Sequence, residues 1–248
     1  MDVEVVGTIP VEFVEFVKST LNWAYEAIGT RPEYLEVYIY ESTGAKLHAL
    51  LESALLVGVP VTGDYPVSHE AWLGWPRIHV DYEKLRALDR DVVKALLVHE
   101  AAHSVLHGNL ASYVVTLRED LASKLGEIAL PALYVASTVV KDVEVHELLA
   151  ERGLRDLVEA YYNYVAKELP GVVCNGVLGI LELSKLIPPC LFVECKPHPK
   201  LLLSEACRAL YEKVLEAARE VIEEPGDLYS RVNRLLERAL GLAEETLS

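Results

Sequence analysis

The residues of this chain with the clearest chemical potential lie between positions 99 and 103, where the sequence reads HEAAH. In a helix, side chains four residues apart share one face, about 5–6 Å apart at Cβ, so the imidazoles of His99 and His103 could bind one divalent metal ion. Glu100 is turned about 100° around the helix axis, which places its carboxylate beside such an ion and not on it. A carboxylate there can act as a general base toward a water molecule. The spacing therefore predicts a metal centre with hydrolytic chemistry.

The helix that must position these side chains is itself indicated by the sequence. Asp89 is a suitable N-cap, and the apolar pattern runs to about His107, where Gly108 ends it. His99 and His103 continue the apolar stripe of this helix, so both imidazoles are predicted to be buried. Buried imidazoles need partners, which a metal ion would supply.

The chain around this helix predicts an α+β fold that is mostly α. The periodicity indicates further elements before residue 90: helices over 11–28 and 45–56, and strands over 34–40 and 77–82. Beyond residue 112 the pattern is helical almost to the end. We therefore expect a domain with a small sheet over 1–169 and a helical C-terminal subdomain over 170–248.

The HEAAH helix resembles the active-site helix of the zincin metallopeptidases, and the order helix, strand, helix, strand before it is similar to theirs over roughly residues 10–150. The resemblance implies a zincin-like domain with a small sheet, an active-site helix and a following helix that carries a ligand. It also implies one Zn²⁺ per chain, bound by His99 and His103, with Glu100 as general base. By order alone, the strand over 77–82 takes the place of the zincin strand that forms the upper rim of the cleft and binds extended substrate by β-addition.

The third ligand is less clearly marked. Metzincins continue as HExxHxxGxxH, but Leu and Asn occupy the positions of that glycine and third histidine here. The chain is more similar to gluzincins and aspzincins, in which a carboxylate on a following helix completes the site. The predicted helix over 135–149 offers Asp142 as this ligand, with His146 in the supporting position four residues later. Glu144 and His146 remain rival ligands, because the family pattern has Glu as ligand and Asp or Asn as its follower.

Two more roles near the predicted ion can be considered. His107 extends the histidine series by one turn, but it lies about 6 Å farther along the axis, so we expect it to be a residue of the C-terminal helix end and not a ligand.

A hydrolytic site also needs a group that stabilises the oxyanion of the tetrahedral intermediate. No spacing singles out one of the candidates, which are His146, Tyr113, Arg152, Arg155 and the tyrosine-rich run 161–164.

The composition limits the classes of partner. Asp and Glu number 38 against 23 Lys and Arg, a net charge of −15 that repels nucleic-acid phosphates, so we expect no nucleic-acid partner. The longest apolar run, 128–140, contains a proline and is shorter than the roughly 20 residues of a membrane span, so we expect no transmembrane helix.

The acidic N-terminal residues lack the basic region of a signal peptide, which predicts a cytoplasmic protein. The absence of glutamine, with a single methionine, is typical of a hyperthermophilic source.

The cysteines gather in one stretch of the C-terminal third, at positions 174, 190, 195 and 207. Buried free thiols, one or two disulfides, and a metal site all remain open. Three pairings of four cysteines are possible, and the sequence does not distinguish them.

These features together predict a zinc metallopeptidase that hydrolyses peptide bonds of a peptide or protein substrate. The alternative is a zinc-bound but catalytically silent or latent zincin scaffold that acts as a peptide-binding or regulatory protein. In the latent form of this hypothesis, the cysteine-bearing segment 174–207 plugs the cleft. The oligomeric state stays open.

Overall fold

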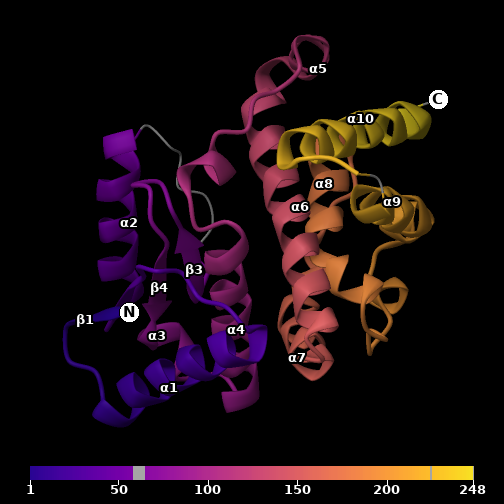
Figure 1. The fold of residues 1–248 in the computed structure, drawn as a ribbon. Coiled ribbons are helices and arrows are strands. Elements are labelled where there is room, and N and C mark those ends of the chain that lie inside the picture. The colour runs from indigo at the N-terminus through magenta and orange to yellow at the C-terminus, as the bar shows by residue number, and fades with distance from the viewer. Residues whose placement is uncertain (58–64, 224, 248) are drawn as a thin grey trace. The chain divides into compact units, whose positions relative to one another are not determined.

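A computed structural model describes residues 1–57, 65–223 and 225–247 of the chain. It divides into two compact units, Met1–Val114 and Val115–Ser248, which are described separately below (Figure 1). The predicted α+β class, mostly α with a small sheet, is confirmed.

The first unit contains the sheet and the helix that carries the HEAAH run. Its elements are β1 (Asp2–Val6), α1 (Val11–Ile28), β2 (Glu36–Tyr40), α2 (Thr43–Val57), β3 (Val67–Glu70), β4 (Arg77–Asp81), α3 (Tyr82–Leu85), α4 (Arg90–Leu106) and the 3₁₀ helix η1 (Leu110–Tyr113). In Figure 1, α2 lies on one side of the strands and α4 on the other.

Among the described residues, the strands form one sheet in the order β1-β2-β4-β3. β1, β2 and β4 run parallel, and β3 is antiparallel to β4. The predicted strands over 34–40 and 77–82 correspond to β2 and β4, whereas β1 and β3 were not expected. The strand over 77–82 was assigned to the rim of a cleft, and this assignment is wrong: β4 is an interior strand, and the antiparallel edge strand is β3.

The sheet face toward α4 is apolar. Val37 and Ile39 of β2 and Ile78 and Val80 of β4 are all fully buried there. β3 places His69 on this same face, because His69 is the register partner of Ile78. α4 packs against both β3 and β4.

The α2 side of the sheet carries a buried polar network that fixes β3 to β4. The Glu70 carboxylate forms an ion pair with Arg77 and lies 3.4 Å from Nε2 of His79, and it accepts the backbone N–H of Trp72 at 2.8 Å. Nδ1 of His79 lies 3.0 Å from the Tyr40 hydroxyl. Burial lowers the pKa of His79, although Glu70 acts in the opposite direction. A slip of β3 by one residue would separate these buried partners, so the network favours the observed strand register.

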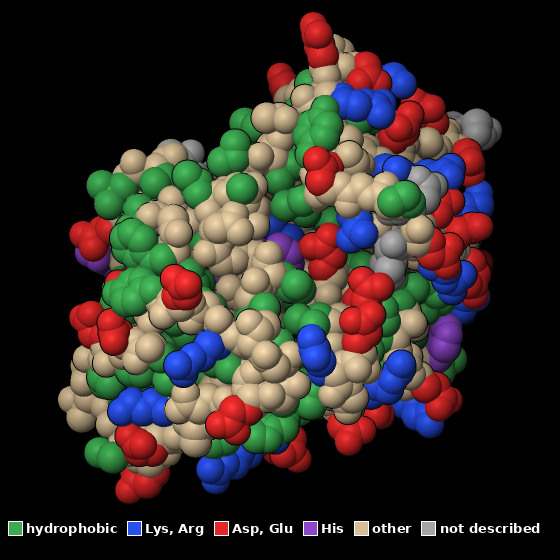
Figure 2. Space-filling view, viewed as in Figure 1, with side chains coloured by type: hydrophobic (Ala, Val, Ile, Leu, Met, Phe, Trp, Pro, Cys, Tyr) green, Lys and Arg blue, Asp and Glu red, His purple; other side chains and the backbone are tan. Residues whose placement is uncertain are grey.

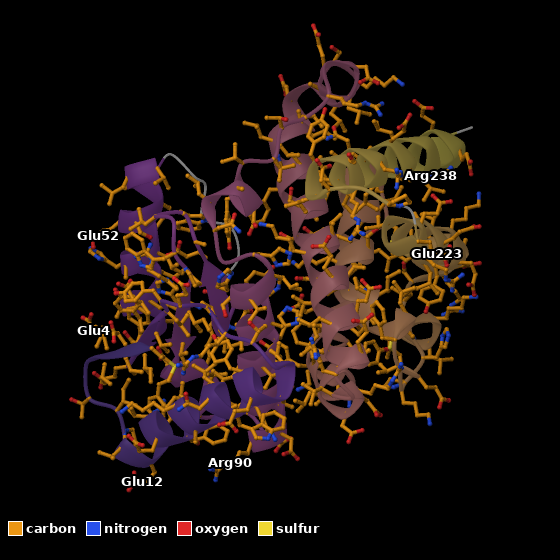
Figure 3. All side chains as sticks on the ribbon, viewed as in Figure 1. Glu4, Glu12, Glu52, Arg90, Glu223 and Arg238 are labelled. Carbon is orange, nitrogen blue, oxygen red and sulfur yellow. A yellow bond between two sulfur atoms is a disulfide. The ribbon has the colours of Figure 1, made fainter. Side chains whose placement is uncertain are left out.

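α1 supports the start of α4. The predicted bounds of α1, after Pro10 and before Gly29, are confirmed, with Gly29 in the left-handed region at φ 85°. The guanidinium of Arg90, the first residue of α4, lies 4.3 Å from the centre of the Phe16 ring on α1. Figure 3 labels Arg90 at this end of the unit.

The secondary structure of the second unit, over its described residues, consists of helices. Its elements are α5 (Glu119–Leu125), η2 (Gly126–Ile128), α6 (Ala129–Glu151), α7 (Arg155–Val165), η3 (Leu169–Gly171), α8 (Gly176–Leu186), η4 (Pro188–Leu191), η5 (Pro199–Leu201), α9 (Glu205–Glu223) and α10 (Leu228–Leu247). α6 begins before Pro131, which lies in its first turn, where a missing N–H breaks no helical hydrogen bond.

The core of this unit is continuous across residue 170. α6 packs against α8, α9 and α10, and one apolar cluster includes Val139 of α6, Leu181 of α8 and Leu236 of α10. The compact unit therefore begins at residue 115, and the expected boundary at 169/170 falls inside it. Removing residues 170–248 would expose the apolar face of α6.

The four cysteines form two disulfides, Cys174–Cys207 and Cys190–Cys195. Of the three states considered for these residues, free thiols, disulfides or a metal site, the structure therefore shows disulfides, in one of the three possible pairings. The first joins residues 33 positions apart and the second residues 5 positions apart. Cys207 is fully buried, in the same cluster as α6 and α8.

The surface of α9 and α10 is highly charged, with both signs interspersed (Figure 2). Arg238 of α10, labelled in Figure 3, donates two hydrogen bonds to the Glu220 carboxylate of α9, at 2.7 and 2.8 Å. In the part of the chain that the structure describes, no helix has the length and apolar character to cross a bilayer, as expected.

The two disulfides should differ in their contribution to stability. In the chain-entropy model, the loop closed by Cys174–Cys207 contributes about 4 kcal/mol and the short Cys190–Cys195 loop about 2 kcal/mol. We expect the double variant Cys174→Ala/Cys207→Ala to lose about twice the free energy of unfolding lost by Cys190→Ala/Cys195→Ala. Guanidinium unfolding followed by circular dichroism measures both, and equal losses would contradict this expectation.

Candidate functional site

The HEAAH run lies on α4, which is buried on nearly all sides. His99 and His103 are 2% and 9% exposed, and their rings lie with centroids 4.6 Å apart. Their Nε2 atoms converge to 3.0 Å. α4 is also fixed to α1, since the Tyr25 hydroxyl lies 2.8 Å from the Ser104 hydroxyl oxygen. Burial raises the pKa of Tyr25 to about 12, so the phenol is neutral.

The convergent nitrogens fit a divalent ion of the size of Zn²⁺. With metal–nitrogen distances of about 2.0–2.1 Å and tetrahedral angles, two ligand nitrogens lie about 3.3 Å apart. The observed 3.0 Å is close to this value. The spacing of the two Nε2 atoms is therefore compatible with one shared ion.

Glu100 differs from both histidines in its environment. It is partly exposed, whereas the flanking His99 and Ala101 are buried. Partial exposure of this residue is compatible with the predicted role of a base acting on water.

His107 has the C-terminal position predicted for it, and it also contacts His103. It is the C-cap residue of α4, and its backbone N–H donates to the carbonyl of His103 at 2.7 Å. Its Nδ1 lies 3.1 Å from Nδ1 of His103. The Nδ1 side of the His103 ring thus faces His107, and its Nε2 faces His99.

His69 was not recognised from the sequence, but it lies next to the histidine pair. Its ring is nearly parallel to that of His103, with an interplanar angle of 6° and centroids 6.1 Å apart. Nδ1 of His69 lies 3.1 Å from the hydroxyl of Tyr113, the last residue of η1. No sequence spacing links positions 69 and 103; the antiparallel register of β3 brings them together. Of the candidates for oxyanion stabilisation, Tyr113 thus belongs to the unit that contains His99 and His103.

The predicted ligand helix is α6 of the second unit. Asp142 and His146 are buried and lie one turn apart on a common face. Burial lowers the pKa of the adjacent Lys141 to about 8, although the neighbouring carboxylates raise it. The sequence-based expectation is that Asp142 completes a ligand set with His99 and His103 of the first unit. Because Asp142 belongs to the other unit, its ligation stays a prediction.

Glu144 has a structural partner within the second unit. Its carboxylate accepts a hydrogen bond of 2.7 Å from the guanidinium of Arg231 on α10, in a pair of which each side chain is about one-fifth exposed. Glu144 points away from the Asp142 face, because two helical positions correspond to about 200°. This pairing disfavours Glu144 as a ligand.

Three of the remaining candidates for oxyanion stabilisation have contacts typical of packing residues. Arg155 donates to the carbonyl of Phe192, and the buried Tyr162 donates to that of Pro197. The ring of Tyr161 packs against His146, with centroids 5.0 Å apart.

Comparison of the chain with protein-family models, with curated proteins and with solved structures found no match.

Proposed function

We propose that this chain is a zinc-dependent peptidase in which His99, His103 and Asp142 bind the ion and Glu100 is the general base. The observation that supports it most strongly is the convergence of two buried imidazole nitrogens to 3.0 Å, with a partly exposed glutamate between them in the sequence. Two imidazoles and one carboxylate are a ligand set typical of catalytic Zn²⁺, which keeps a further position open.

When bound, Zn²⁺ supplies Lewis-acid polarisation of a water molecule and of the substrate carbonyl. Glu100 takes a proton from the attacking water and later gives it to the leaving amine, so one carboxylate serves as base and then as acid. His107 holds the ring of His103 from its Nδ1 side. The buried positions of His99 and His103 limit competing water around the reacting atoms.

A peptide substrate has a suitable partner in β3. This edge strand pairs with β4 on one side, and no strand of the described residues pairs with its other side. An extended peptide can add to such an edge through main-chain hydrogen bonds. The scissile bond would then lie next to the strand that carries His69, on the sheet face that packs against α4.

Zinc binding and hydrolysis should separate in variants of the HEAAH run. We expect wild type to bind about one Zn²⁺, His99→Ala and His103→Ala to lose it, and Glu100→Gln to keep it while hydrolysis falls below detection, because Glu100 is beside the ion and not a ligand. Metal analysis by mass spectrometry and cleavage of fluorescein-labelled casein measure the two properties. His48→Ala is the matched control, since His48 is highly exposed on α2.

Each contrary result identifies a different error. Cleavage by Glu100→Gln at the wild-type rate would contradict the role of Glu100. Zinc-loaded wild type that cleaves no protein or peptide substrate would favour the catalytically silent, peptide-binding scaffold.

The third ligand can be tested with two neighbouring carboxylates of α6. We expect Asp142→Ala to weaken Zn²⁺ binding by more than about 100-fold, beyond the loss typical of residues that only support a ligand. Glu144→Ala should bind Zn²⁺ like wild type and lose about 1 kcal/mol of stability, because it breaks a partly buried ion pair with Arg231. Competition with a chromogenic chelator measures the affinity. Normal zinc affinity in Asp142→Ala with a loss in Glu144→Ala would reverse the assignment.

A further inference from the structure

We propose that His69 is a catalytic residue that donates a hydrogen bond to the oxyanion formed during peptide hydrolysis, and that Tyr113 is its positioning residue. This inference rests on the proposed peptidase function and deepens it. It assigns the role that the sequence leaves open. The three side chains it depends on, His69, His103 and Tyr113, all belong to the first unit.

The first argument is the position of His69. It lies on β3 with its ring almost parallel to that of His103, at a centroid distance of 6.1 Å. His69 is therefore the neighbour of a proposed zinc ligand and also a member of the strand whose edge can pair with a peptide. A carbonyl oxygen drawn toward His99 and His103 from a peptide on β3 would approach His69 as well.

The second argument is the hydrogen bond between His69 and Tyr113. The phenol oxygen and Nδ1 are 3.1 Å apart. A phenol is a more acidic donor than the N–H of a neutral imidazole, so we assign the hydroxyl as donor and Nδ1 as acceptor. A neutral imidazole has one N–H, and with Nδ1 accepting, that proton is on Nε2. Tyr113 thus makes Nε2 of His69 a donor, which is what an oxyanion requires.

The third argument is that both residues are held in place. Trp72 packs against the Tyr113 ring edge-to-face, at 6.5 Å and 88°. The next residue along β3, Glu70, is fixed on the opposite sheet face by Arg77 and His79, and it accepts the N–H of Trp72. A slip of β3 by one residue would turn His69 away from α4. The buried network therefore positions the donor before any substrate binds.

The kinetic test uses zinc-loaded full-length protein and a quenched fluorescent peptide that wild type cleaves. We expect His69→Phe, which keeps a flat ring beside His103, to lower kcat about 100- to 1000-fold, the effect of losing one oxyanion donor. KM should change less than about threefold, because the hydrogen bond strengthens in the transition state. His69→Asn, which keeps an N–H donor, should recover part of the loss, and Tyr113→Phe should lower kcat about tenfold.

Matched controls separate this role from general damage. His48→Phe and Tyr34→Phe make the same substitutions at exposed positions of the first unit and should behave as wild type. All variants should bind about one Zn²⁺. Wild-type kcat in His69→Phe, with Glu100→Gln inactive, would overturn the role of His69 and leave the proposed function intact. Equal activity of wild type and Glu100→Gln would instead overturn the proposed function.

A second measurement needs neither zinc nor activity. In metal-free protein labelled with ¹⁵N-histidine, NMR at pH 8 should show His69 as the neutral tautomer with its proton on Nε2; the His69→Phe variant identifies its signals. Tyr113→Phe should reduce this tautomer preference. A proton found on Nδ1 of His69 in wild type would overturn the proposal, because Nε2 would then be an acceptor.

Discussion

The site depends on one constraint, the burial of two imidazoles one turn apart on a helix that is itself enclosed. α4 packs against α1, β3 and β4, and the two rings have little freedom to turn outward. Burying polar rings is costly unless their nitrogens have partners. The two Nε2 atoms converge, and His107 lies at the opposite nitrogen of His103, which is the arrangement that the proposed metal site requires. The surrounding unit can be understood as the scaffold that maintains this arrangement.

The sheet contributes through its two unlike faces. Its apolar face packs against α4 and carries His69 toward His103, while its polar face ties β3 to β4 through Glu70, Arg77 and His79. A four-residue edge strand has few ladder hydrogen bonds of its own, so side-chain bonds on the far face determine its register. The same network thus has a structural role on one face and a positioning role on the other.

Local signals predicted much of the fold, and long-range pairing determined the rest. The end of α1 follows from the neighbouring Gly29. Asp89 does precede α4 as predicted, although its side chain makes no capping hydrogen bond there. β3 has no alternating apolar pattern, so neither the strand nor the role of His69 was visible. The boundary at residue 115 depends on α6 packing against α8, α9 and α10. Asp142 and Glu144 are both plausible carboxylate ligands by sequence alone. The difference between them is that Glu144 pairs with Arg231, 87 residues away, which the sequence does not reveal.

Whether the two imidazoles bind a metal ion is the claim on which the account depends. Anomalous scattering from crystals of the zinc-loaded protein, measured on both sides of the zinc absorption edge, tests it most directly. The account predicts one zinc peak in contact with Nε2 of His99 and of His103, with a carboxylate oxygen of Asp142 as a further ligand. A map with no peak between the two histidines, or with zinc bound only elsewhere on the chain, would contradict it.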